Sequence, residues 1–236
     1  SRGLGDVYKR QDYDRWRELG NPHWGYDEVL PYFQRAMHAE TLRGPADAQG
    51  GPWHIADLAT DPLSDAFIQA AAHCGIAPIT DFNQGNNAGA AYFRMNTRAG
   101  VRMSTSAAYL KPAWQRPNLR VLSGVRATRL MIESNRVTGV EVLSQGRIEV
   151  VRARQEVILC AGAIQSPQLL QLSGVGDPAL LESLGIEVKH VLKGVGENLQ
   201  DHLQVRPSYR CRGAITLNDI AHSRWRSAWE FMRYQL

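Results

Sequence analysis

The stretch from Glu156 to Gly176, EVILCAGAIQSPQLLQLSGVG, constrains the fold more than any other part of the sequence. It opens with Val157-Ile158-Leu159, a short apolar run that is typical of a strand buried on both faces of a parallel sheet. Cys160-Ala161-Gly162-Ala163 follows and contains no large side chain, so the backbone there can approach another group closely. The pattern predicts a buried strand that leads directly into a turn of small residues.

A capped helix is predicted after this turn. Ser166-Pro167 is a favourable N-cap and N1 pair, and the leucines at 169, 170 and 172 provide an apolar face. Gly174 suits the left-handed position that ends a helix. Such a unit places a helix N-terminus beside the end of a parallel strand, where nucleotide cofactors often bind. The same pattern also fits an ordinary strand–helix unit of any α/β protein.

The complete string resembles the second signature of the glucose–methanol–choline (GMC) flavin oxidoreductases. The resemblance rests on Gly162, Ser166-Pro167, Leu169-Leu170 and the run Ser173-Gly174-Val175-Gly176. It extends over most of the chain from about Asp12, and includes DYDRWRELGNPHWGYDEVLPYF, Ala108-Tyr109-Leu110 and GVGENLQDH at 194–202. One departure is Gln84, where members of the family often carry Gly after Asp-x-Asn.

The resemblance implies an α/β (mixed α+β) fold made of two incomplete domains. One is part of a Rossmann-like FAD-binding domain with a β-meander insert, and the other is part of a substrate domain with an antiparallel sheet. Residues 12–116 are expected mainly on the substrate or cap side, 117–202 in the FAD-binding domain, and 203–236 in the substrate domain again. Residues 1–11 fit the family poorly and are interpreted as disordered or as a scar.

The periodicity of the sequence predicts individual elements. Alternating residues predict strands, and caps with apolar spacing predict helices. The expected strands are 51–55, 90–96, 119–122, 128–132, 137–143, 147–151, 188–192 and one from Leu203 to Tyr209. The expected helices are 26–37, 61–74, 105–114, 177–184 and 223–236, and Asp61 is the predicted cap of the second.

FAD is the cofactor that the resemblance implies. The family's motif Gly-x-x-Val/Ala-x-Arg places a backbone contact to adenine at Ala127, although an ordinary strand residue is the alternative reading. Ala161 and Gly162 are expected to contact FAD through their backbone. Asn198 lies in the segment that the family keeps near the flavin. Gly174-x-Gly176 and Gly194-x-Gly196 do not have the arrangement of a dinucleotide fingerprint.

By the same resemblance, the complete protein would oxidise a small-molecule alcohol, choline-like or another primary alcohol, by hydride transfer to FAD. The family's catalytic His and its glycine-rich fingerprint lie outside this chain, so we assign no catalytic residue within it and expect no turnover from it alone. His202 beside Asp201 is the one candidate general base, and a structural hydrogen-bonding role is the alternative. A hydroxynitrile-lyase-like member and a non-catalytic nucleotide-binding module stay open as other functions. The electron acceptor does not follow from the residues, and a homo-oligomer is compatible with the family.

Composition argues against several other classes of protein. Lys+Arg 27 against Asp+Glu 23 gives a net charge of +4 without a basic block, which disfavours nucleic-acid binding. No apolar run has the length of a membrane span. The three cysteines and seven histidines lack metal-ligand spacing, and the cysteines are interpreted as buried, reduced thiols. These features predict a cytoplasmic protein and leave a peripheral membrane association open.

Overall fold

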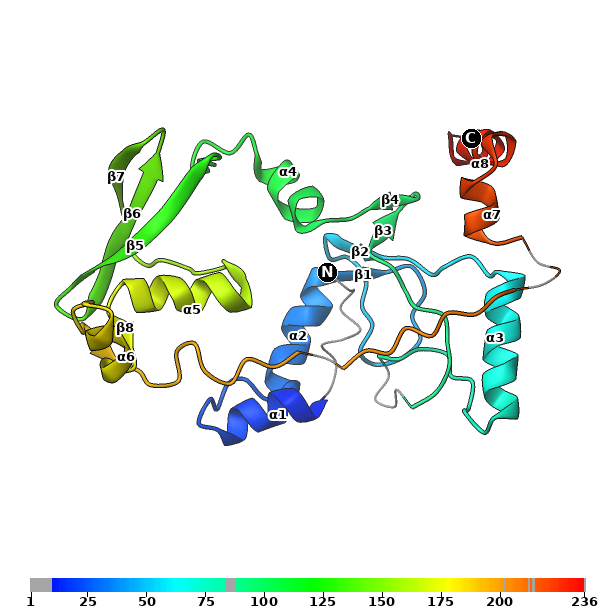
Figure 1. Cartoon of the computed structure of the whole chain (residues 1–236), viewed down its shortest axis with the longest axis horizontal. Coiled ribbons are helices and arrows are strands. Elements are labelled where there is room, and N and C mark those ends of the chain that lie inside the picture. The colour runs from blue at the N-terminus through cyan, green and yellow to red at the C-terminus, as the bar shows by residue number, and fades with distance from the viewer. Residues whose placement is uncertain (1–9, 84–87, 202, 212, 214, 236) are drawn as a thin grey trace. The chain divides into compact units, whose positions relative to one another are not determined.

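The computed structural model describes residues 10–83, 88–201, 203–211, 213 and 215–235, with side chains to residue 233. The chain divides into two compact units (Figure 1). Unit 1 is drawn from Ser1–Leu119 and Tyr209–Leu236, and unit 2 is Arg120–Ser208. Each unit is described by itself below. No helix among the described residues is long and apolar enough to cross a membrane.

Unit 1 begins with two helices that pack on each other. These are α1 (Arg10–Glu18) and α2 (Tyr26–Ala36). Tyr13 is buried and meets Phe33 edge to face, with 5.8 Å between ring centroids. α2 leads into β1 (Met37–Ala39), which pairs in parallel with β2 (Trp53–Ile55). Met37, Ala39 and Ile55 form the core of this unit, and the apolar side of α2 packs against them.

The next helix, α3 (Pro62–His73), begins where the sequence predicts. The Asp61 side chain accepts a hydrogen bond from Leu63 N, as an N-cap does. The antiparallel pairing expected in this part of the chain is limited to β3 (Thr97–Arg98) with β4 (Val101–Arg102) and one bridge, Ala56 to Met95. The strand predicted at 90–96 is otherwise absent from the described residues, because only its two ends find backbone partners.

Unit 1 contains four further helical segments among the described residues. A π-helical turn, η2 (Ser106–Leu110), runs into α4 (Lys111–Ala113), which together cover the helix predicted at 105–114. α8 (Arg224–Gln235) matches the helix predicted from the spacing of Trp225 and Trp229. α7 (Leu217–Ala221) was not predicted, and its Thr216–Asp219 capping box is the signal that marks it.

Unit 2 contains a three-stranded antiparallel meander. Its strands are β5 (Val125–Glu133), β6 (Arg136–Ser144) and β7 (Arg147–Arg152), in the order β5-β6-β7 (Figure 1). Both hairpins turn through residues with positive φ, Ser134-Asn135 and Gln145-Gly146. Three of the predicted strands are thereby confirmed. The strand predicted at 119–122 is wrong, since these residues have no strand partner in the described chain.

The second half of unit 2 mixes helices with a small parallel pair. α5 (Gly162–Leu172) is followed by β8 (Val175–Gly176), α6 (Pro178–Ser183) and β9 (His190–Val191). β8 and β9 are parallel neighbours, with Val175 opposite His190. Asp177 caps α6 by accepting from Ala179 N and Leu180 N, and Leu181 on this helix is fully buried.

Three further expectations about the fold are wrong. Val157–Leu159 forms no strand, and Ile158 is 75% exposed, because no described strand lies beside it to accept its hydrogen bonds. Leu203–Tyr209 has no strand structure either, and Leu203 is 96% exposed. The cysteines are unpaired but not buried as a group, since Cys74 and Cys160 are exposed and Cys211 is half-buried.

Candidate cofactor-binding site

The first predicted contact, Ala161–Gly162, lies at the start of α5. The helix begins about one turn before the predicted Ser166, with Ala161 as its N-cap and Pro167 inside it. Ser166 still contributes to this end, because its hydroxyl accepts a hydrogen bond from Ala161 N at 3.1 Å. No side chain caps the N–H groups that follow, so they can serve a polar ligand.

Gly162 meets two requirements of a close backbone approach. Its φ is +87°, a conformation that favours glycine strongly. A Cβ added at Gly162 would meet nothing within 4 Å, so the space above this backbone is open within the described residues. A ligand could therefore reach the backbone here without displacing any described side chain.

The second predicted contact, Ala127, lies on β5 beside an irregularity. Ala127 pairs with Val142 and Arg129 with Glu141, so Thr128 is the extra residue of a β-bulge. The Thr128 hydroxyl donates to Glu141 Oε1 at 2.8 Å, and Arg129 Nη2 lies 2.9 Å from Glu141 Oε2. These hydrogen bonds, that of Thr128 first, lower the pKa of Glu141. Bulges often re-aim backbone next to binding sites, and Ala127 is exposed.

The third predicted contact, Asn198, follows a turn that is attached to α5. Asn198 is exposed and has φ of +56°, which asparagine tolerates better than most residues. Val195, three residues earlier, is buried, and its carbonyl oxygen accepts a hydrogen bond from Gln171 Nε2 at 3.0 Å. The turn is therefore fixed to the C-terminal half of α5.

The three predicted contacts lie at separate points of unit 2. Gly162 and Gln171 are about 13 Å apart along the axis of α5. The end of α5 is bonded to β5 further along, where Ser173 Oγ accepts from Leu130 N at 2.8 Å. No hydrogen bond of the described structure joins Ala127, Gly162 and Asn198 to one another.

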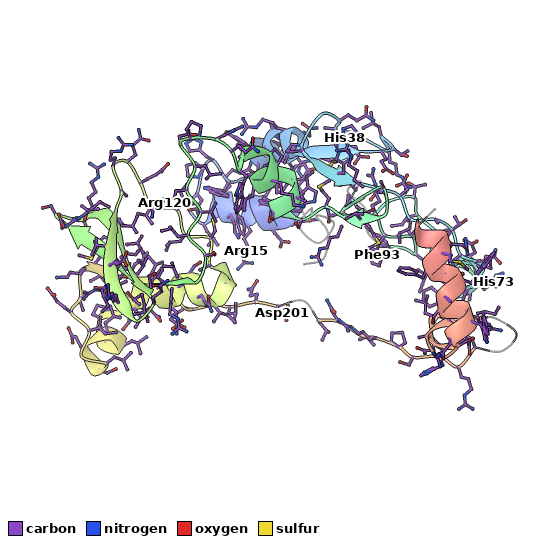
Figure 2. All side chains as sticks on the ribbon, turned by 90° about the horizontal axis from the view of Figure 1, so that it is seen from above. Arg15, His38, His73, Phe93, Arg120 and Asp201 are labelled. Carbon is purple, nitrogen blue, oxygen red and sulfur yellow. The ribbon has the colours of Figure 1, made fainter. Side chains whose placement is uncertain are left out.

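The candidate general base, His202, lies outside the described residues, and its role stays a prediction. Its neighbour Asp201 lies on a segment without helix or strand (Figure 2). Among the described residues, no three His, Cys, Asp or Glu side chains gather as metal ligands would.

Three residues that shape this site were not singled out from the sequence. Gln171 interrupts a leucine run, which is a signal that could have marked it. Ser173 was named only as part of the run Ser173–Gly176 that carries the resemblance, without a role of its own. Thr128 gives no sequence signal, because a bulge depends on the register of the partner strand.

Unit 1 contains a buried ion cluster around Arg94, whose side chain is 4% exposed. Arg94 Nη1 lies 2.8 Å from Asp47 Oδ1 and 3.0 Å from Asp81 Oδ2, and Nη2 donates to Thr41 O. Burial acts to raise the pKa of Asp57 beside them. Hydrogen bonds from Thr41 and Arg43, with the charges of Arg43 and Arg94, outweigh burial and lower it. The cluster joins loops that have little regular structure.

A pair of histidines bridges β1 and β2 in unit 1. His38, labelled in Figure 2, lies opposite His54, with 4.4 Å between ring centroids. His38 Nδ1 accepts a hydrogen bond from Gly50 N at 3.1 Å. Burial, with the charges of Arg98 and His38, lowers the pKa of His54 against the opposing effect of Glu40.

The comparisons with known proteins agree in the kind of protein they find. A sequence profile of the family described as GMC oxidoreductase matches residues 8–204. An oxygen-dependent choline dehydrogenase from Photobacterium profundum is 44% identical over 220 residues, which are 91% of this chain and 39% of that protein. The chain thus spans well under half of the length of this curated relative.

Two solved structures resemble the structure of this chain. Pyridoxine 4-oxidase from Mesorbium loti has a TM-score of 0.69 and 34% identity, and the match covers 77% of this chain and 36% of that one. An FAD-dependent oxidoreductase from Chaetomium thermophilum has a TM-score of 0.76 and 29% identity over 81% of this chain and 36% of its own. Both support the mixed α/β fold predicted from the sequence.

Proposed function

The chain belongs to the GMC oxidoreductase family, and on that premise we propose that it is part of an FAD-dependent enzyme that oxidises the CH–OH group of an alcohol. The observation that carries the proposal is the 44% identity to an oxygen-dependent choline dehydrogenase over 91% of this chain. It favours choline or another small primary alcohol as the substrate. Bound FAD would accept the hydride that leaves the alcohol carbon.

The residues described above fit such a cofactor. Gly162 supports it most directly, because its positive φ and the open space above it allow a ligand to reach the backbone. The uncapped N–H groups that follow at the start of α5 would donate hydrogen bonds to polar groups of the ligand. Ala127 would contribute backbone contacts beside the bulge of β5. Asn198 would present its amide from the turn that Gln171 supports.

The roles of the two units are part of the same proposal. Unit 2 would hold the cofactor, and unit 1 would belong to the substrate side. The catalytic base would lie outside the described residues, with His202 retained as a structural group near the cofactor. The unpaired cysteines support a reducing, cytoplasmic location.

The test uses the intact protein that contains this chain. It is purified, its bound flavin is released and identified, and choline and simple primary alcohols are added without oxygen. We expect the released flavin to be FAD. We also expect at least one of the alcohols to reduce the bound flavin, seen as a loss of the absorbance of oxidised flavin. A protein that carries FAD but is not reduced by any alcohol would support a non-redox member of the family, and a protein without flavin would contradict the proposal.

A further inference from the structure

Gln171 is a half-buried polar side chain of α5 that lies between Leu170 and Leu172 in the sequence. Its amide Nε2 donates a hydrogen bond of 3.0 Å to the carbonyl oxygen of Val195, 24 residues further along the chain. Val195 is buried, so this bond is shielded from water at its acceptor end. A long-range bond of this kind fixes where the backbone at Val195 lies relative to α5.

Two glycines leave room for the Gln171 side chain. A Cβ at Gly196 would lie 2.5 Å from Gln171 Nε2, closer than such atoms come in real structures. A Cβ at Gly176 would lie 3.4 Å from Gln171 Cγ. The stem of Gln171 therefore runs beside one glycine and its amide ends beside the other, which suits a side chain of this length.

The backbone segment that Gln171 holds, which leads into Val195, is also fixed by backbone hydrogen bonds. Leu192 N donates to Gly176 O at 3.0 Å, and Val195 N donates to Leu192 O at 3.1 Å. From Val195 the chain enters two positions with positive φ, Gly196 at +85° and Asn198 at +56°. A non-glycine residue in this conformation persists where its surroundings hold it.

We propose that Gln171 is a positioning residue, which holds the Val195–Asn198 turn and so aims the Asn198 amide at the cofactor. This inference rests on the proposed cofactor role of Asn198. Gln171 itself need not contact FAD, because it acts through the carbonyl of Val195. Two features are required of it, an N–H donor and a stem that fits between the glycines.

The test compares Gln171→Glu and Gln171→Ala with the wild-type holoenzyme. Glutamate keeps the shape but, when ionised, cannot donate to the Val195 carbonyl. We expect both variants to bind FAD about three- to tenfold more weakly, the effect of one hydrogen bond, and to shift the visible circular dichroism of the flavin. Gln168→Ala is the matched control, since Gln168 is exposed on the same helix. Wild-type FAD affinity and spectrum in Gln171→Glu would overturn the proposal.

A second pair of variants covers the case in which the Gln171 variants do not fold. Gly196→Ala would push the Gln171 amide away, whereas Gly185→Ala introduces the same kind of backbone strain, at φ of +69°, in open space. We expect the flavin spectrum to change in Gly196→Ala and not in Gly185→Ala. Equal spectra in the two would also overturn the proposal.

Asn198→Ala separates this inference from the proposed function. If the flavin spectrum changes in Asn198→Ala but not in Gln171→Glu, the positioning role of Gln171 is refuted, whereas the cofactor role of Asn198 is not. An effect of Gln171→Glu without any effect of Asn198→Ala would show that Gln171 does not act through Asn198, and the proposal would fail as stated. Absence of FAD from the wild-type protein would instead contradict the proposed function.

Discussion

Replacing Ser173 by alanine should destabilise unit 2 at one identifiable point. Ser173 is 5% exposed, and its hydroxyl makes two hydrogen bonds. It accepts from Leu130 N at 2.8 Å and donates to Leu169 O at 2.5 Å. Leu130 is also buried, so the substitution leaves its N–H group on β5 without a partner and without access to water.

The size of the effect follows from these two bonds. An unsatisfied buried N–H costs about 1–3 kcal/mol. The carbonyl of Leu169 loses less, because a carbonyl oxygen with one partner removed is tolerated better than an orphaned N–H. We therefore expect Ser173→Ala to lower the free energy of unfolding of unit 2 by about 2–3 kcal/mol.

Hydrogen exchange followed by mass spectrometry is the suitable assay, because unit 2 contains no Trp, Tyr or Phe and all six tryptophans lie in unit 1. Peptides from β5 and α5 should exchange about 30- to 150-fold faster in Ser173→Ala if they open with the unit. Tryptophan fluorescence, which reports unit 1, should show an unchanged unfolding curve.

Ser183→Ala is the control for this prediction. The Ser183 hydroxyl also donates to a helix carbonyl, that of Leu180 at 2.7 Å, but it is exposed. Its loss should change stability by less than about 0.5 kcal/mol. If β5 exchanges at the same rate in Ser173→Ala and wild type, the Leu130–Ser173 bond does not stabilise the unit, and the reasoning is refuted.

Three further predictions concern other parts of the chain. Arg94→Met leaves Asp47 and Asp81 buried without their cation and should destabilise unit 1 by about 3–5 kcal/mol, measured by denaturation with tryptophan fluorescence. The pKa of His54 is lowered from 6.5 in the folded state, so the unfolded chain takes up a proton at higher pH than the folded one, and the free energy of unfolding falls as the pH drops through about 6.5. Between about pH 7.5 and 5.5, chemical denaturation should therefore show a smaller loss of this free energy in His54→Gln than in wild type. Gly162→Val forces a β-branched residue to φ of +87° and should reduce the FAD content of the intact protein, and unchanged flavin content would contradict the placement of the cofactor.

Local chemistry in the sequence predicted the elements whose stability is local. Asp61 caps α3 and Asp177 caps α6, because an N-cap needs only neighbouring N–H groups. The hairpins of the meander were predictable for the same reason, since Gln145-Gly146 provides the positive φ values that a tight turn requires.

Features that depend on distant parts of the chain were not predictable. The apolar composition of Val157–Leu159 indicates a strand, but a strand also needs neighbours, which composition does not supply. The burial of Arg94 requires several loops to come together around it, and no sequence pattern indicates that they do. At the candidate site, Gly162 was predictable as a small residue, whereas the link from Gln171 to Val195 depends on how the chain returns to α5.

The space around each glycine divides the family signature into two parts. A Cβ at Gly174 would lie 2.4 Å from Glu187 O, and the carbonyl of Gly174 accepts from Lys189 N and His190 N. Glycine is needed there so that β9 can pack against the end of α5. Gly162 has a similar positive φ but open space above it among the described residues, so packing against those residues does not explain its small size. The C-terminal part of the signature therefore stabilises the fold, and the N-terminal part is the one left accessible to a ligand.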